Sequence, residues 1–167
     1  PFLSNYAQIL YKISIWIARK NFSVYTIVSK KRGDKMKIVL TDAQTVLDDI
    51  VNADVLNRFG EVESFGLLKY EEVAEKIADA DIVVCNKTLL DSHTMRLAKN
   101  LKYIGLFATG YNNIDLDYCT QNGITVCNAG SYSTNAVAQH TFALILEHFN
   151  HTAESYRFVQ DGKWKRS

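Results

Sequence analysis

Short apolar runs alternate with longer amphipathic segments from Met36 onward, and this alternation predicts a parallel α/β sheet. Five predicted strands follow one another: 37–40, 61–65, 81–85, 103–108 and 124–127. The last two runs are apolar almost throughout, which is typical of strands buried on both faces. Helical patterns separate the earlier strands, at 46–60, 70–80 and 92–98. Repetition of strand and helix at this spacing predicts parallel pairing with right-handed crossovers.

The expected fold is therefore a flavodoxin-like doubly wound domain, and its ligand site is expected at one edge of the sheet. Small and polar residues follow the last two predicted strands, at 108–113 and 128–134. In an open parallel sheet such turns lie together at the carboxyl edge, where ligands bind. A phosphoacceptor receiver domain shares this order, but it needs an acidic pair after the first strand and an aspartate after the third. This chain has Asp42 alone and Asn86 at those places.

The segment that starts at Asn135 is apolar around most of a helix, with its large apolar side chains between Val137 and Phe149. A helix of this kind is normally covered on every side. The pattern can run to about Asp161, on the order of 40 Å at 1.5 Å per residue. Because a domain of this size covers only one face of such a helix, the other face calls for a second domain or a second subunit.

Composition indicates a single core and an unusually basic N-terminal segment, residues 1–35, which we call the leader. The chain has 167 residues, is 47% hydrophobic and carries a formal charge of +1, which fits a single domain with a sizeable core. Residues 1–35 hold seven basic side chains against one acidic, whereas 36–167 is net acidic. The apolar run at 9–18 is too short to span a bilayer. We expect 1–35 to be a loosely attached or non-native extension; its aromatic residues leave an interfacial helix as the alternative.

Cysteine and histidine residues predict reduced thiols and no metal site. Cys85, Cys119 and Cys127 form no C-x-x-C pair, which favours a cytoplasmic protein. His148 and His151 are three residues apart beside Glu147, but no third ligand has suitable spacing. No motif that reads nucleic-acid bases accompanies the basic leader. Neither a nucleic-acid partner nor membrane contact through 1–35 is expected.

Four motifs together resemble one enzyme family. They are DIVVCNKTLLD at 81–91, ATGYNNIDL at 108–116, NGITVCNAGSYSTNAVAQH at 122–140 and DGKW at 161–164. Their order and spacing are similar to those of the D-isomer-specific 2-hydroxyacid dehydrogenases, and most to the glycerate dehydrogenase (hydroxypyruvate reductase) branch. The resemblance covers 36–164 and leaves out 1–35.

The resemblance implies that this chain is the substrate-binding (catalytic) domain of an NAD- or NADP-dependent oxidoreductase about twice as long. Residues 36–133 would form that domain, and 134–167 would form a crossover helix and the start of a linker to a Rossmann domain. No Gly-x-Gly-x-x-Gly occurs in these 167 residues. The catalytic Arg, Glu and His of the family also fall outside them. The chain alone is therefore expected to be inactive and to bind a small 2-oxo or 2-hydroxy acid, such as hydroxypyruvate or glycerate.

Seven site residues follow from the resemblance: Asn86, Lys87, Ala108, Thr109, Gly110, Tyr132 and Ser133. Backbone amides of the turn 108–110 would bind the substrate carboxylate, and Thr109 would also lie beside the cofactor. A glycine-containing turn suits this role because N–H groups can converge on an anion without a side chain in the way.

Other readings of the same residues remain open. Thr109 can serve as a strand-end hydroxyl that bonds nearby backbone, and Asn86 and Lys87 as turn residues that face water. Ser133 or Thr134 can cap the long helix. For the whole chain, the alternative function is a non-catalytic module of the same fold that binds a carboxylate or forms a dimer. In the enzyme reading, a homodimer through the crossover helix region is expected.

Overall fold

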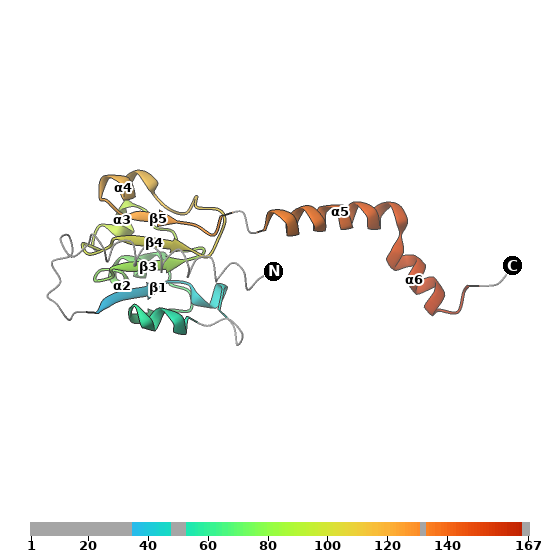
Figure 1. The fold of residues 1–167 in the computed structure, drawn as a ribbon, viewed down its shortest axis with the longest axis horizontal. Coiled ribbons are helices and arrows are strands. Elements are labelled where there is room, and N and C mark those ends of the chain that lie inside the picture. Colours follow the sequence, from blue (N-terminus) through green and yellow to red (C-terminus); the bar gives the residue numbers. More distant parts are fainter. Residues whose placement is uncertain (1–34, 48–52, 131–132, 165–167) are drawn as a thin grey trace. The chain divides into compact units, whose positions relative to one another are not determined.

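The computed structural model describes residues 35–47, 53–130 and 133–164, and within them a five-stranded parallel sheet. The strands are β1 (Met36–Leu40), β2 (Gly60–Ser64), β3 (Ile82–Cys85), β4 (Tyr103–Leu106) and β5 (Thr125–Cys127). Their order is β2-β1-β3-β4-β5, and all four pairings are parallel (Figure 1). This confirms the predicted flavodoxin-like arrangement, in which ligand sites lie at the carboxyl ends of the strands.

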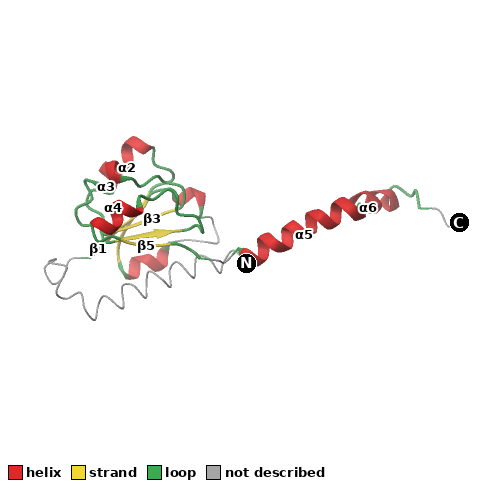
Figure 2. Ribbon diagram, turned by 90° about the horizontal axis from the view of Figure 1, so that it is seen from above, coloured by secondary structure: helices red, strands yellow, loops and turns green. Residues whose placement is uncertain are grey.

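Both faces of the sheet carry buried side chains, as a parallel sheet requires. On one face, strand residues such as Val39, Val83 and Ile104 share a core cluster with Val73 and Met95 from two of the covering helices. Figure 2 shows these helices on the same side of the sheet: α2 (Tyr70–Lys76), α3 (Ser92–Met95) and α4 (Leu116–Gln121). The alternate strand positions are also buried: Ile38, Leu40, Ile82, Val84 and Tyr103.

The connection from β1 to β2 differs from the predicted helix over 46–60. Its described parts are two 3-10 helices, η2 (Ala43–Thr45) and η3 (Asp54–Arg58), and residues 48–52 lie outside the described part of the chain. The amides of Ala43 and Gln44 donate to the carbonyls of Phe65 and Gly66, at 2.8 and 3.0 Å. These bonds tie the start of the segment to the loop after β2.

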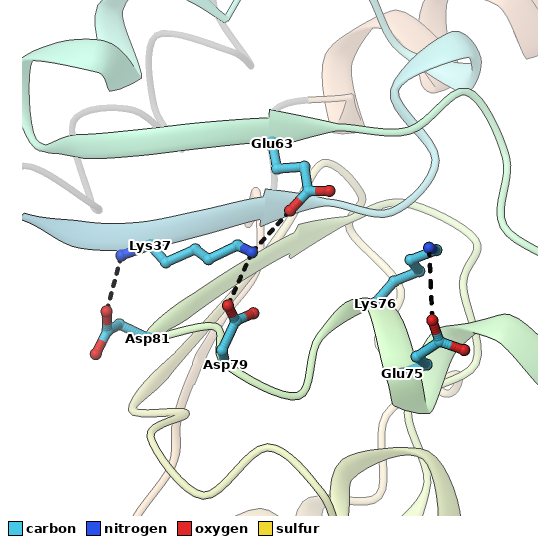
Figure 3. A network of polar contacts seen from close by, with 6 residues as sticks. All are labelled: Lys37, Glu63, Glu75, Lys76, Asp79 and Asp81. Carbon is cyan, nitrogen blue, oxygen red and sulfur yellow. Dashed lines mark hydrogen bonds and ion pairs between the residues drawn. The ribbon is translucent and has the colours of Figure 1, made fainter.

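An ion-pair network joins the strands at the opposite, amino edge of the sheet (Figure 3). Lys37 Nζ contacts Glu63 at 2.8 Å and Asp79 at 2.9 Å, while the Lys37 backbone N–H donates to the Asp81 carboxylate at 2.8 Å. Hydrogen bonds from the ammonium group, first to Glu63 and then to Asp79, raise the pKa of Lys37. The network links β1 to β2 and to the turn before β3. A separate contact at 3.7 Å joins Lys76 to Glu75 within α2.

Two helices follow the sheet in a second compact unit, Ser131–Ser167: α5 (Thr134–Asn150) and α6 (Thr152–Gln160). The sequence predicted one helix to about Asp161, and this was wrong in one respect. His151 adopts a left-handed conformation, with φ of 48°, and separates the two helices. The Glu147 carboxylate accepts hydrogen bonds from the Thr152 hydroxyl and the Ala153 N–H, so the end of α5 caps the start of α6.

Neither helix of this unit contains a buried residue. Several large apolar side chains are more than half exposed: Val137, Phe142, Leu144, Leu146, Phe149 and Tyr156. No helix within the described residues is long and apolar enough to cross a membrane.

Candidate functional site

The candidate site lies at the carboxyl edge of the sheet, where the chain leaves β3, β4 and β5. Cys85 at the end of β3 pairs in register with Leu106 at the end of β4. The next residues are also joined, because Phe107 N–H donates to the Cys85 carbonyl at 2.8 Å. Lys87 and Ala108 each follow two residues after that matched pair. Adjacent strands are about 4.8 Å apart, so the predicted residues of both turns leave the sheet side by side.

The turn after β4 presents unused backbone amides. Ala108 is half-buried, and Thr109 and Gly110 are exposed. Among the described residues, no acceptor lies within hydrogen-bond reach of the Thr109 and Gly110 N–H groups. Both residues follow the end of β4, so two consecutive N–H donors there are without an acceptor among the described residues. Such donors can bind an anion such as a carboxylate.

The Ala108 and Thr109 carbonyls of this turn are, by contrast, held by the segment that follows β5. Ala129 N–H donates to the Ala108 carbonyl at 2.9 Å, and Asn128 Nδ2 donates to the Thr109 carbonyl at 2.7 Å. The Thr109 hydroxyl donates to the Gly130 carbonyl at 3.0 Å. The hydroxyl therefore bonds backbone, as one reading of the sequence allowed, but on a neighbouring segment. These bonds fix the turn while leaving its amides available.

The two glycines of this region have different backbone requirements. Gly130 has φ of 62°, which L side chains rarely adopt. Gly110 does not have a positive φ, and a Cβ placed there would meet its nearest atom, Asn112 Oδ1, at 3.4 Å, an ordinary contact. The fold alone thus requires glycine at position 130 and not at 110. Glycine at 110 leaves the space beside its N–H without a side chain.

The loop after β3, which carries Asn86 and Lys87, is held by a carboxylate that the sequence analysis did not identify. Asp42, at the end of β1, is only 1% exposed. It accepts from the N–H groups of Asn86 (2.9 Å), Lys87 (2.5 Å) and Thr88 (2.8 Å), and from the Thr88 hydroxyl (3.0 Å). No local sequence pattern indicates these bonds, because the partners lie 44 to 46 residues away along the chain.

The two side chains that were predicted as site residues in this loop, Asn86 and Lys87, have different environments. Asn86 Nδ2 donates to Thr45 Oγ1 at 3.0 Å, so its amide group braces η2. Lys87 is exposed, and within the described part of the chain its ammonium group has no ion-pair partner. Lys87 therefore supplies a positive charge beside the turn 108–110, and Asn86 contributes mainly to the shape of the loop.

The loops after β3 and β4 are also bonded to each other farther from the sheet. Asn113 Nδ2 donates to the Thr88 carbonyl at 2.8 Å. Leu90 forms a parallel bridge with Ile114, through Leu90 N–H to the Asn113 carbonyl (2.8 Å) and Asp115 N–H to the Leu90 carbonyl (2.9 Å). A pocket of about 170 Å³ lies next to them, lined by Tyr111, Leu116, Val126 and Asn128. The edge is thus a rigid surface of three interlinked loops.

Tyr132 and Ser133 complete the predicted set. Tyr132 lies outside the described residues. Ser133 is the residue before α5, and its carbonyl accepts from Val137 N–H at 2.8 Å, but its side chain makes no capping hydrogen bond. Ser133 therefore occupies the N-cap position of α5, but its side chain does not make the capping hydrogen bond.

Comparison with known proteins assigns this chain. The family described as "D-isomer specific 2-hydroxyacid dehydrogenase, catalytic domain" matches residues 37–160. The chain belongs to the D-isomer-specific 2-hydroxyacid dehydrogenases. Its described sheet and the amide-bearing turn lie inside the matched region.

Individual members of the D-2-hydroxyacid dehydrogenase family differ in the acid that their names specify. A hydroxypyruvate reductase of Blautia hydrogenotrophica is 35% identical over 133 residues, which are 78% of this chain and 41% of that protein. A glyoxylate reductase of Pyrococcus furiosus is 37% identical over 97 residues, 58% of this chain and 29% of that protein. This chain thus spans less than half the length of either relative.

A solved structure with the same fold carries a bound cofactor. It is an acyclic imino acid reductase in complex with NADPH and D-Arg, with a TM-score of 0.63 and 29% sequence identity. The match covers 76% of this chain and 41% of that one. The fold described above is thus shared with a reductase that was solved in complex with a nicotinamide cofactor.

Proposed function

We propose that this chain is the substrate-binding part of an NAD(P)-dependent D-2-hydroxyacid dehydrogenase that acts on glycerate and hydroxypyruvate. The single observation that carries the proposal is the pair of unused N–H groups at Thr109 and Gly110, on a turn whose Ala108 and Thr109 carbonyls accept hydrogen bonds from the segment after β5. A substrate carboxylate can accept from both donors without any rearrangement of the turn. The family membership and the hydroxypyruvate reductase relative support the substrate class.

The remaining site residues act around that carboxylate. The Lys87 ammonium is a point charge suited to the hydroxyl or phosphate end of a three-carbon acid, and Asn86 shapes the loop that carries it. Tyr132 and Ser133 are proposed as further substrate contacts from the segment that leads into α5. Thr109 lies on the cofactor side of the carboxylate, where its hydroxyl bond to Gly130 keeps the turn fixed.

The cofactor would be NAD or NADP, bound mainly by a Rossmann domain outside these 167 residues. When bound, it supplies a hydride to the carbonyl carbon of the 2-oxo acid. The residues of this chain hold the acid so that its carbonyl carbon faces the cofactor, which is catalysis by orientation. No Gly-x-Gly-x-x-Gly is present in the sequence, so we expect these residues to contribute position and not cofactor affinity.

The organisation of the longer protein follows the same proposal. Residues 1–35 are an extension, 36–133 the substrate-binding domain, and 134–167 the crossover helices and the start of a linker. The exposed apolar side chains of α5, among them Phe142 and Phe149, would be covered in a homodimer. Cys85, Cys119 and Cys127 are free thiols in the structure, which supports a cytoplasmic location.

The test separates binding from turnover. Titration of the ¹⁵N-labelled chain with D-glycerate should shift the amide signals of Thr109 and Gly110, whereas glycerol, which lacks the carboxylate, should leave them in place. The chain alone should not oxidise NADH in the presence of hydroxypyruvate, and a longer chain that includes the nucleotide-binding domain should. Unshifted Thr109 and Gly110 signals at saturating D-glycerate would refute the proposed site.

A non-catalytic module of the same fold is the second candidate. The exposed apolar face of α5 favours it, because that face can form a dimer without any hydride transfer. The module would bind D-glycerate as above, but the longer chain would then oxidise no NADH with hydroxypyruvate, glyoxylate or 3-phosphohydroxypyruvate.

A further inference from the structure

Asp42 is a desolvated carboxylate located at the functional edge of the sheet. It is 1% exposed, and it shares its two oxygens among three backbone N–H groups and one hydroxyl. The hydroxyl is itself oriented, because Thr41 Oγ1 donates to Thr88 Oγ1 at 2.8 Å. A buried charge is tolerated only when it is bonded this completely.

The three amides of Asn86, Lys87 and Thr88 converge on one point, as they do in backbone sites that bind anions. In this protein the anion is a side chain of the chain itself. Asp42 thereby occupies the amides after β3, whereas the N–H groups of Thr109 and Gly110 have no acceptor among the described residues. Only these last two N–H groups are available to an external carboxylate.

We propose that Asp42 is a positioning residue for substrate recognition: it occupies the amides after β3, fixes the loop that presents Lys87, and so directs the substrate carboxylate to Thr109 and Gly110. The proposal rests on the proposed function of that turn. Asp42 itself contacts no substrate, because its oxygens are buried and fully bonded. Asp42 acts by setting the distance and angle between the Lys87 ammonium and the amides of Thr109 and Gly110.

The structure contains the contacts through which this effect would act. Asp42 holds Thr88, and the Thr88 carbonyl accepts from Asn113 at 2.8 Å. Asn113 also bonds Leu90, two residues beyond Thr88, so the loops after β3 and β4 form one bonded unit. A shift of 86–88 would therefore move Lys87 directly and the turn 108–110 through Asn113. Displacements near 1 Å are enough to impair orientation.

A second buried carboxylate provides the matched control. Asp81 is 6% exposed and accepts from the Lys37 N–H at 2.8 Å, at the amino edge of the same sheet. Both carboxylates hold backbone N–H groups on a neighbouring segment, but only Asp42 does so beside the candidate site. Asp81→Asn should thus reproduce the cost of losing a buried structural charge without any effect on recognition.

The first experiment compares Asp42→Asn with Asp81→Asn in the full 167-residue chain, with D-glycerate as the probe. Asparagine has one acceptor oxygen, and its NH₂ would face the N–H groups of 86–88, so the loop must move. We expect the dissociation constant for D-glycerate, followed at the Thr109 and Gly110 amide signals, to rise roughly tenfold or more in Asp42→Asn and to stay within about twofold in Asp81→Asn. Equal affinity of wild type and Asp42→Asn would overturn this inference and leave the proposed function standing. No binding by the wild-type chain would overturn both.

The second experiment fills the vacated position from solution. Asp42→Gly removes a CH₂–COO⁻ group. Acetate, CH₃–COO⁻, has the same carboxylate and carbon skeleton as the group removed. Acetate should raise the melting temperature of Asp42→Gly and restore part of its affinity for D-glycerate, whereas chloride at equal ionic strength should not. In the wild-type chain acetate can bind only at the turn 108–110, where it competes with D-glycerate, so it should raise the melting temperature less than in Asp42→Gly and should not raise the affinity for D-glycerate. Recovery of thermal stability without any recovery of affinity would reduce Asp42 to a structural role and overturn the inference.

Discussion

The sheet unit and the helical unit use the same apolar residues in opposite ways. Leu106 in β4 is fully buried, whereas Leu146 in α5 is 58% exposed. The strands are covered on both faces, and neither α5 nor α6 contains a buried residue. The sheet unit thus has its own core, and the helical unit presents an exposed apolar surface. Residue type alone does not distinguish the two situations; the neighbours of each side chain do.

The largest expected effect comes from the same substitution made in each unit. Leu106→Ala removes a fully buried side chain and leaves a cavity, so the free energy of unfolding should fall by about 3 kcal/mol. Leu146→Ala removes a side chain that is already mostly in water, and the fall should be below about 0.5 kcal/mol. Urea unfolding of the two variants, followed by far-UV circular dichroism, measures the difference.

The Leu146→Ala variant also reports on what covers α5. If α5 lies at a dimer interface in the 167-residue chain, the loss in stability should grow with protein concentration, and sedimentation should show fewer dimers than in the wild type. A loss near 3 kcal/mol at low concentration, with a monomer throughout, would contradict the comparison drawn here, because Leu146 would then belong to a core.

Alanine substitution should have a smaller effect on stability, and a different one at each of the two glycines, Gly110 and Gly130, in the sheet unit. Gly130→Ala forces a Cβ onto a backbone with φ of 62° and should cost about 1 kcal/mol. Gly110→Ala should leave stability nearly unchanged, because the nearest atom to the new Cβ is Asn112 Oδ1 at 3.4 Å. Its effect should be on D-glycerate, which the added methyl group would meet beside the Gly110 N–H. Thermal unfolding and the amide titration together give both results.

The opposite result for the stability of Gly110→Ala and Gly130→Ala would contradict the assignment of the two glycines. If Gly110→Ala unfolds the turn and Gly130→Ala leaves stability intact, glycine at 110 is structural, and the argument for a ligand beside it fails. A Gly130→Asn variant is the conservative control, because asparagine tolerates the left-handed region better than alanine. It should recover part of the stability that Gly130→Ala loses.

The fold could be predicted from the sequence because buried parallel strands carry a direct signal. The apolar runs that contain Ile82 to Cys85 and Tyr103 to Leu106 became β3 and β4, since short apolar segments bounded by polar turns have few other uses. The turn at Ala108–Gly110 was also placed at the correct edge by strand order alone. These inferences need only local pattern and the geometry of parallel sheets.

The parts that were missed depend on contacts distant in sequence or on a single backbone angle. The role of Asp42 was missed, because one aspartate after a strand does not indicate that it binds three amides in the loop after another strand. The break at His151 had a weak local signal: Asn150 and Thr152 favour helix ends, and histidine is enriched among residues with positive φ. Apolar periodicity dominated that signal and predicted one continuous helix.

The smallest expected effects come from two capping carboxylates, one in each unit. Asp91 accepts from Thr94 N–H at 2.8 Å at the start of α3, and Glu147 accepts from Thr152 and Ala153 at the start of α6. Burial alone would raise the pKa of Asp91, but its hydrogen bonds from Thr94 and Tyr70 outweigh this and lower it. The hydrogen bond from the Thr152 hydroxyl, followed by that from the Ala153 N–H, lowers the pKa of Glu147.

Both carboxylates should lose their stabilising effect in acid, but with different consequences. A carboxyl group with a lowered folded-state pKa stabilises the fold above its ordinary pKa, near 3.8 for Asp and 4.5 for Glu, and this is lost as the pH falls through the lowered value. Asp91→Asn should therefore lower the melting temperature of the sheet unit at pH 7 and remove part of its acid sensitivity. Glu147→Gln should leave that melting temperature unchanged and reduce only the helical signal.

Residue-level amide exchange of the two variants distinguishes these outcomes. In Asp91→Asn, exchange should rise across the sheet unit, since α3 is packed into a cooperative core through Met95. In Glu147→Gln, faster exchange should be confined to the first turn of α6, because no core connects that turn to the rest of the unit. Faster exchange throughout α5 and α6 in Glu147→Gln would mean that the two helices unfold together. The helical unit would then unfold cooperatively without a buried core. The two units would differ in the burial of their side chains but not in cooperativity.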